Sequence, residues 1–224
     1  MIYLHHIPGA CGTSLVYTFL AQAGDPVELC AQLRQNDGIL YVKDTYKAYA
    51  NRAVWLEENT YFGWSTKPVY ETVLPQNTFS ITVLRDPVNR LVSCYRAFLL
   101  THEWKGKDFW DYINSLPNEL LFRQITMFSQ KCDIDEAHQK IGQLSYAFRS
   151  ERYLLAIEQL SCVVHAPLKQ FHITAQDAKN GDVVNPRVSH EANIYARRKL
   201  KERMEPEYEL LRRLAATSSS TFSP

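Results

Sequence analysis

The sequence predicts an α/β fold, because two of its segments show the same order of apolar strand, short loop and amphipathic helix. The strand of the first segment is predicted at residues 2–7, and that of the second at residues 79–84. The second run is rich in β-forming residues and unbroken, as expected for a strand that is buried on both faces. A strand, a loop of small residues and a helix form the opening unit of many α/β folds.

The first segment contains a short loop, residues 8–12, before a helix that is predicted to open at Thr13 or Ser14. Apolar residues then recur at helical spacing, at positions 15, 16, 19 and 20. Thr13 is a suitable N-cap, and Gly24-Asp25-Pro26 is a suitable stop. The helix dipole and free N–H groups behind such a loop suit a phosphate group. A tight turn with a capping threonine explains the same pattern, and the lysine of the common P-loop is missing before Thr13.

The second segment gives the clearest structural prediction. Asp86 is a good N-cap and Pro87 a good first helical residue, and apolar residues then follow one helical face at positions 88, 91, 92, 95, 98 and 99. Arg85 ends the strand, where ligands bind in open α/β sheets. Ser93 lies on the same helix face as Asp86, so Arg85 and Ser93 could hold one phosphate together. The alternative is that Arg85 pairs with a carboxylate and Ser93 is a small packing residue.

The rest of the chain is predicted to be mostly helical. Helical segments are expected at 108–148 in pieces, at 160–171, and at 189–214 with a restart at Pro206. Residues 153–157 indicate a short strand, and the polar residues 175–187 indicate a surface loop.

Composition limits the classes of function. The chain has 224 residues, of which 46% are hydrophobic and 22% charged, and no repeat or linker is visible. We therefore expect one domain at 1–216 and a flexible tail at 217–224. The net charge of +1 argues against a broad nucleic-acid surface, and apolar runs are too short for a membrane span. Five scattered cysteines without a CxxC pair argue against zinc and a disulfide framework, and no signal peptide is visible, so a cytoplasmic location is expected.

Two motifs carry a resemblance to a known family. Residues 6–14, HIPGACGTS, resemble the 5′-phosphosulfate loop of the sulfotransferase family that includes heparan sulfate 2-O-sulfotransferase and related bacterial enzymes, whose form is close to HIPKTGGTS. Residues 81–95, ITVLRDPVNRLVSCY, are similar to the family's 3′-phosphate motif, LRDP-x-x-R-hydrophobic-x-S-x-Y. Fainter similarities follow at 118–128, 153–160, 186–187 and 205–211. The likeness runs nearly end to end, and the first two motifs are its specific part.

This resemblance implies a P-loop-like, three-layer α/β fold with a central parallel sheet flanked by helices. It implies transfer of a sulfuryl group from 3′-phosphoadenosine 5′-phosphosulfate (PAPS) to a hydroxyl or amine acceptor, such as a carbohydrate, without a metal. The product nucleotide would be 3′-phosphoadenosine 5′-phosphate (PAP). The matching positions imply that the donor is bound by Gly9, Ala10, Cys11, Gly12, Thr13 and Ser14 on the 5′ side, and by Arg85, Ser93 and Arg187 at the 3′-phosphate.

Two positions depart from the family pattern. The lysine that faces the leaving oxygen in relatives corresponds to Gly9, and the histidine base of a Gly-His pair corresponds to Trp64. Losing a preorganised cation costs about 2.7–4 kcal/mol of barrier, so either another residue acts or the protein is slow or inactive. Lys67 and His102 are candidates for the missing roles, although the sequence favours a solvated loop lysine and a surface histidine at these positions. Further candidates for the base are Glu57, Glu58 and Glu71.

Three classes of function stay open. The paired motifs favour an active sulfotransferase, whereas Gly9 and Trp64 favour a catalytically impaired protein that binds PAPS or PAP. A nucleotide-dependent phosphotransferase fits least, because the sequence shows neither a lysine-bearing P-loop nor a clear magnesium-binding acidic site. Donor binding separates the first two classes from the third, and turnover separates the first from the second.

Overall fold

The computed structural model describes residues 2–21, 62–74, 76–100, 108–164, 167–170 and 190–221. Their contacts group into two compact units. The sheet unit consists of Met1–Leu84 and Gln143–His172, and the helical unit of Arg85–Gly142 and Ile173–Pro224. In the described residues, no helix is long and apolar enough to cross a membrane.

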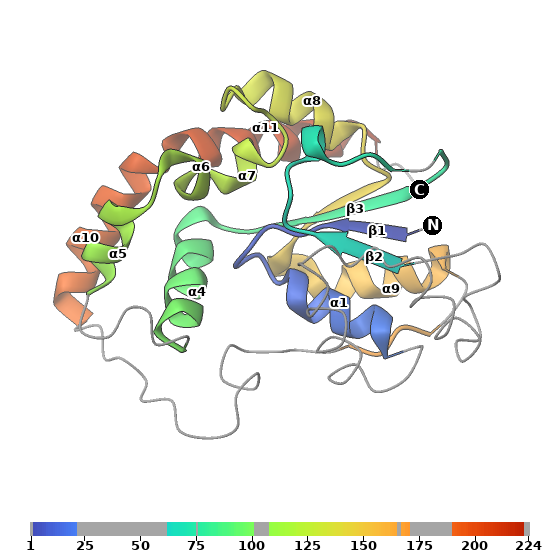
Figure 1. The fold of residues 1–224 in the computed structure, drawn as a ribbon, viewed down its shortest axis with the longest axis horizontal. Helices are drawn as coiled ribbons and strands as arrows, with labels where there is room; N and C mark the ends of the chain where they lie inside the picture. The colour runs from blue at the N-terminus through green and yellow to red at the C-terminus, as the bar shows by residue number, and fades with distance from the viewer. Residues whose placement is uncertain are drawn as a thin grey trace. The chain divides into compact units, whose positions relative to one another are not determined.

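The sheet unit is built on a four-stranded sheet in which all neighbouring strands pair in parallel (Figure 1). The strands are β1 (Ile2–His5), β2 (Phe62–Ser65), β3 (Phe79–Leu84) and β4 (Tyr146–Arg149), in the spatial order β2-β1-β3-β4. β1 and β2 are buried along their whole length, as expected for parallel strands that are covered on both faces. The predicted α/β class, with a parallel sheet and flanking helices, is confirmed.

Two helices of the sheet unit lie on the same face of the sheet (Figure 1). The described helices of this unit are α1 (Gly12–Leu20), the 3-10 helices η1 (Val69–Glu71) and η2 (Ser150–Arg152), and α9 (Tyr153–Val163). The ring of Phe19 in α1 stacks on that of Phe62 in β2, with 4.6 Å between centroids. The hydroxyl of Thr18 in α1 lies 3.0 Å from that of Tyr153, so a buried hydrogen bond joins α1 to α9.

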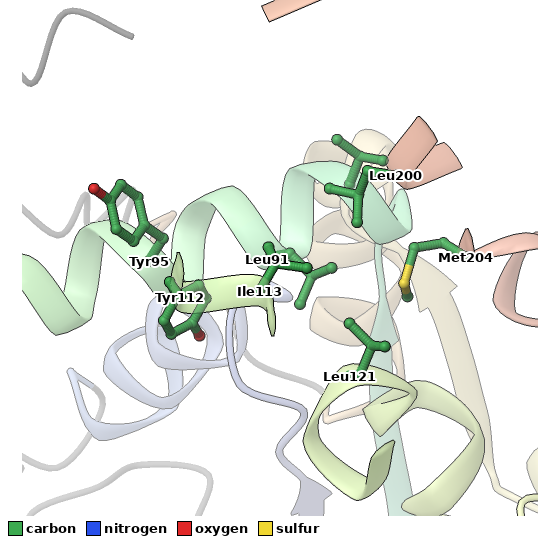
Figure 2. Close-up of a cluster of buried hydrophobic side chains, with 8 residues drawn as sticks. Leu91, Tyr95, Tyr112, Ile113, Leu121, Leu200 and Met204 are labelled. Carbon is green, nitrogen blue, oxygen red and sulfur yellow. The ribbon is translucent and has the colours of Figure 1, made fainter. Parts of the chain in front are cut away.

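The helical unit has an apolar core on several helices. The described helices of this unit are α4 (Pro87–Leu100), α5 (Phe109–Ser115), α6 (Asn118–Leu121), α7 (Arg123–Thr126), α8 (Ile134–Gly142), α10 (His190–Arg203) and α11 (Glu205–Thr221). Figure 2 shows the core cluster, which consists of Val88, Leu91, Tyr95, Tyr112, Ile113, Leu121, Leu200 and Met204. Burying each of these side chains stabilises the fold by about 1.5–3 kcal/mol. The α4 members of the cluster lie on the face predicted from the sequence.

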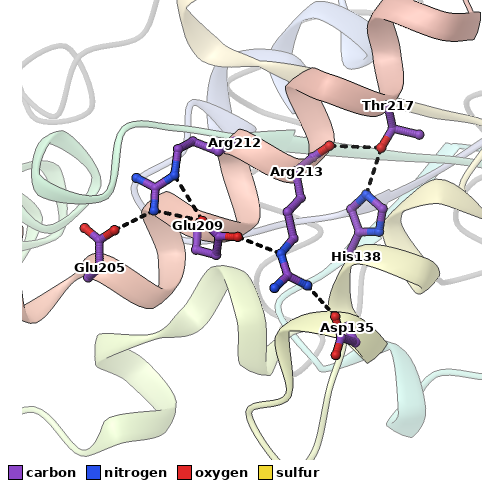
Figure 3. Close-up of polar contacts among 7 residues, drawn as sticks. All are labelled: Asp135, His138, Glu205, Glu209, Arg212, Arg213 and Thr217. Carbon is purple, nitrogen blue, oxygen red and sulfur yellow. Dashed lines mark hydrogen bonds and ion pairs between the residues drawn. The ribbon is translucent and has the colours of Figure 1, made fainter.

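Charged contacts on the surface link α11 to α8 (Figure 3). Arg213 pairs with Asp135 of α8 and, at 2.8 Å, with Glu209 on its own helix. Nε2 of His138 in α8 lies 3.1 Å from the hydroxyl of Thr217 in α11. These side chains are at least partly exposed, so they orient the two helices and add little to stability.

Two local predictions are wrong. Residues 153–157, predicted as a strand, begin helix α9, and the strand is β4, which precedes them. The buried residues of α9 are Tyr153, Ala156, Ile157 and Leu160, a helical spacing that a short apolar run does not reveal. The helix expected at 160–171 is therefore the end of α9, which stops at Val163.

The start of α1 also differs from the prediction. The helix begins at Gly12, and its N-cap is Cys11 in the left-handed conformation, without a side-chain capping bond. Thr13 therefore lies inside the first turn and does not cap it. The predicted stop at 24–26 lies outside the described residues.

The C-terminal helical prediction is confirmed with its restart. α10 ends at Arg203 and α11 begins at Glu205, so Pro206 occupies the first turn of α11, where its missing N–H costs nothing. α11 continues to Thr221, into the stretch expected to be a tail.

Candidate functional site

The loop between β1 and α1 is a tight turn with two left-handed residues. Gly9 has φ 79° and Cys11 has φ 63°. The backbone N–H of Ala10 donates to the carbonyl oxygen of Ile7 at 3.2 Å and closes the turn. Glycine adopts a positive φ without strain, so the turn favours glycine at position 9. The loop thus leads directly into the positive end of the α1 dipole.

His6 explains why residue 12 is glycine. A Cβ atom added at Gly12 would lie 2.0 Å from Cδ2 of His6, which no relaxed structure allows. The His6 ring is buried and makes an edge-to-face contact with Trp64 of β2, at 5.2 Å between centroids. The backbone N–H of His6 donates to the carbonyl oxygen of Ser65 at 2.9 Å. These contacts hold the ring against the start of α1.

The turn after β2 carries Lys67. Its backbone N–H donates to Oγ of Ser65 at 2.8 Å, and its side chain is exposed. His5 of β1 pairs with Ser65 of β2, and the two strands are parallel. The loop after β1 and the turn that carries Lys67 therefore leave the sheet at the same edge. Ligands of open α/β sheets bind at this edge.

The Arg85-Asp86-Pro87 junction has the predicted form. β3 ends at Leu84 and α4 begins at Pro87. Oδ1 of Asp86 accepts the N–H of Asn89 at 2.9 Å, which is the geometry of an N-cap. Arg85 and Ser93 are both half-buried. β3 pairs in parallel with β1, so the carboxyl ends of both strands lie at the same edge of the sheet.

A model of the Sulfotransferase family matches residues 5–212. The chain belongs to the sulfotransferase family. A comparison with curated proteins gave no match. Family membership makes the chain one of the PAPS-dependent transferases, and the match includes the loop and helix of the first segment and the whole of the second.

The structure groups the predicted donor-binding residues of this chain by unit. In the sheet unit, residues 9–14 form one continuous loop and helix start. In the helical unit, Arg85 directly precedes the Asp86 cap, and Ser93 lies on α4. Arg187 and His102 lie outside the described residues, as do Glu57 and Glu58. Glu71 is exposed on η1. Among the described residues, no cluster of His, Cys, Asp and Glu side chains is arranged to hold a metal.

A buried polar network behind the Arg85 junction is absent from the sequence-based predictions. Arg90 and Glu207 are 1% and 0% exposed, and Nη2 of Arg90 lies 3.3 Å from Oε1 of Glu207. Arg90 also donates to the carbonyl oxygens of Leu120 and Leu121, at the end of α6. Arg90 belongs to the 3′-phosphate motif, yet its guanidinium is committed to this core. The sequence pointed to this network only through the presence of Arg90 in the motif. Its partners are distant in the chain, so no local pattern reveals them.

Gln124 and Tyr208 connect this network to the junction. Gln124 donates its backbone N–H to Oε1 of Glu207 at 2.7 Å and its Nε2 to Oε2 at 2.9 Å. Oε1 of Gln124 in turn accepts the backbone N–H of Arg85 at 2.8 Å. Next along α11, the hydroxyl of Tyr208 donates to Oδ2 of Asp86 at 2.8 Å. Glu207 and Tyr208, adjacent residues of α11, therefore hold the two residues that precede α4. Glu207 holds Arg85 through Gln124, and Tyr208 holds Asp86 directly.

Burial is the main cause of the pKa shifts in the described residues near these motifs. It lowers the pKa of His5 to about 4, so this imidazole is neutral at pH 7. Burial raises the pKa of Tyr153 to about 12, although its hydrogen bond with Thr18 acts in the opposite direction. Burial and the neighbouring Asp86 raise the pKa of Tyr208, so its hydroxyl stays protonated and donates. All three groups are therefore uncharged at neutral pH.

Proposed function

We propose that this chain binds PAPS and transfers its sulfuryl group to a hydroxyl or amine acceptor. The observation that carries the proposal is that both family motifs stand on strand–loop–helix junctions, after the neighbouring parallel strands β1 and β3. The family match over residues 5–212 supports the same assignment.

The 5′-phosphosulfate would bind at the N-terminus of α1. Backbone N–H groups and the helix dipole favour an anion there, and Gly9 lets the backbone approach closely. Thr13 is half-buried and Ser14 is 2% exposed. We therefore expect the Thr13 hydroxyl to be a side-chain donor to the ligand, and Ser14 to contribute through its backbone.

The 3′-phosphate would bind Arg85 and Ser93 at the start of α4. The next residue, Asp86, holds the start of α4, because its Oδ1 accepts the N–H of Asn89 and its Oδ2 the hydroxyl of Tyr208. An arginine at this junction suits a phosphate, because charge-assisted bonds to phosphate are strong.

In the proposed reaction, an acceptor oxygen or nitrogen attacks the sulfur as the bond from sulfur to the bridging oxygen breaks. PAP leaves with the bonding electron pair, so negative charge develops on its 5′-phosphate oxygen. The N-terminus of α1 and a cation would stabilise that charge. We assign the cation to Lys67, which is exposed on the turn next to the loop. His102 remains the candidate to accept the proton of the acceptor.

A second candidate function is binding of PAPS or PAP without turnover. Two observations favour it: Gly9 lacks the side chain of the family lysine, and Trp64 stands at the base position and packs on His6. In this case the nucleotide binds with the same contacts, and no sulfuryl group is transferred.

The first test is calorimetric titration with PAP, beside 5′-AMP, ATP and the Arg85→Ala variant. We expect PAP to bind more tightly than 5′-AMP, and the difference to disappear in Arg85→Ala. Equal binding of PAP and 5′-AMP by the natural chain would refute the donor assignment. Preferential binding of ATP would favour the phosphotransferase instead.

Turnover then separates the two sulfotransferase-family functions. Transfer of labelled sulfate from PAPS to a panel of sugar, phenol and amine acceptors measures it directly. If Lys67 supplies the cation, Lys67→Ala lowers kcat by about 100- to 1000-fold and leaves PAP binding nearly unchanged. Lys169→Ala is the matched control, since it removes another exposed lysine of the sheet unit. Equal losses in the two variants would remove Lys67 from the mechanism.

A further inference from the structure

Glu207 occupies an unusual place for a carboxylate. It is fully buried in the helical unit, although it lies in the first turn of α11, where most acidic residues face solvent. Burying a charge this deeply is costly unless several donors satisfy it. Glu207 has them, because Arg90 and the backbone and side-chain N–H groups of Gln124 all point at its two oxygens. Its position is therefore fixed by four bonds.

The Gln124 side chain passes this constraint to the backbone of Arg85. Glu207 accepts the Nε2 protons of Gln124, which leaves the amide oxygen facing the opposite way. That oxygen accepts the N–H of Arg85 at 2.8 Å. A glutamine that was not held by Glu207 could rotate and present its NH2 group to this N–H, which would repel it. The carboxylate thus selects the orientation of the amide that suits Arg85.

Tyr208 adds a second, independent hold. Its hydroxyl donates to the oxygen of Asp86 that does not cap α4. The cap and the tyrosine together use both carboxylate oxygens and fix the plane of the carboxylate. The two residues that lead into α4 are therefore held through different atoms, one by its backbone and the other by its side chain.

We infer that Glu207, Gln124 and Tyr208 are positioning residues for the 3′-phosphate site, and that they hold the Arg85-Asp86 backbone in the conformation that binds the phosphate. The inference rests on the proposed function, because it takes Arg85 as the ligand of the 3′-phosphate. None of the three residues needs to touch the nucleotide. A mobile Arg85 would lose part of the affinity for the 3′-phosphate, since the ligand would then have to order the turn.

The test compares two mild variants, Tyr208→Phe and Gln124→Met, with Ile113→Val as the matched control. Each of the two removes a hydrogen bond to the junction without changing any charge. Ile113→Val trims the core of the same unit at a comparable cost in stability. Circular dichroism checks that each variant is folded. The quantity measured is the ratio of the Kd for 5′-AMP to the Kd for PAP, which isolates the 3′-phosphate.

We expect this ratio to fall about 3- to 10-fold in Tyr208→Phe and Gln124→Met, as for the loss of one positioning hydrogen bond, and to stay unchanged in Ile113→Val. Phosphorus NMR of bound PAP gives a second readout, because its two phosphates resonate separately. The resonance of the 3′-phosphate should shift in the two variants, and that of the 5′-phosphate should not.

Two results would overturn the inference while the proposed function stands. In the first, the natural chain prefers PAP and loses this preference in Arg85→Ala, but both variants keep the full ratio. In the second, the variants weaken PAP and 5′-AMP equally, which is the effect of a merely structural role. If the natural chain itself fails to prefer PAP, the proposed function fails, and this inference with it.

Discussion

The contact between His6 and Gly12 predicts an unusual reversal in the effect of one substitution. Gly12 lies in the first turn of α1 and does not have a positive φ, so Gly12→Ala would ordinarily stabilise the helix by about 0.5–1 kcal/mol. Here the new methyl group would lie 2.0 Å from Cδ2 of His6. The imidazole cannot move aside freely, because Trp64 packs against it. Overpacking of this kind costs about 1–3 kcal/mol, so we expect Gly12→Ala to destabilise the protein.

A double-mutant cycle isolates the clash. His6→Ala removes the ring, and in that background Gly12→Ala should stabilise by the ordinary helix term. The interaction energy between the two sites should therefore equal the clash, about 1–3 kcal/mol. Urea unfolding followed by far-UV circular dichroism measures all four proteins. Additivity within about 0.5 kcal/mol, or stabilisation by Gly12→Ala alone, would show that His6 does not determine the glycine.

Three further predictions follow from buried and exposed charges. Arg90→Met should lower the free energy of unfolding by about 3–5 kcal/mol, because it leaves the buried Glu207 carboxylate without its cation; urea unfolding that shows less than about 1 kcal/mol would contradict this. Burial lowers the pKa of His5 to about 4, so as the pH falls the unfolded chain takes up a proton at His5 before the folded chain does. The free energy of unfolding therefore decreases as the pH is lowered from 6.5 to 4. His5→Phe should remove up to about 3 kcal/mol of that dependence, and an unchanged pH profile would contradict it. Arg213→Ala should leave the Tm nearly unchanged, since its ion pairs are exposed; a large fall in a thermal melt would show that the bridge to Asp135 matters (Figure 3).

Local signals made parts of the fold predictable. β3 and the start of α4 follow from an unbroken run of β-forming residues, a capping Asp86 and Pro87, all of which act within a few residues. Helix α9 was not predictable, because the short run at its start fits a strand and a buried helix equally well. The start of α1 failed for a different reason. A hydroxyl at position 13 suggests a cap, but the turn at Gly9 and Cys11 starts the helix earlier.

In the candidate site too, some residues were predictable from local sequence signals and others were not. The motifs identify the residues that would touch the donor, because those residues cluster in sequence around two junctions. The Glu207 network carries no such signal, since Arg90, Gln124 and Glu207 meet only after the helices of the unit have packed. Charge alone does not separate Arg85 from Arg90 in the motif. Burial does: Arg90 is 1% exposed, whereas Arg85 is half-buried at the end of a strand.

The departure at Gly9 is tied to the shape of the loop as well as to its charge. A left-handed φ at this position would cost a lysine about 1–2 kcal/mol, so the turn and the family lysine are in conflict here. Lys67 stands under no such constraint, because it is exposed on the turn after the neighbouring strand β2. A cation supplied from β2 would leave the β1 loop to bind the anion through its backbone. The loop after β1 would then bind the nucleotide, and Lys67, after β2, would stabilise the leaving group. We therefore expect Lys67→Ala to affect turnover and not nucleotide affinity.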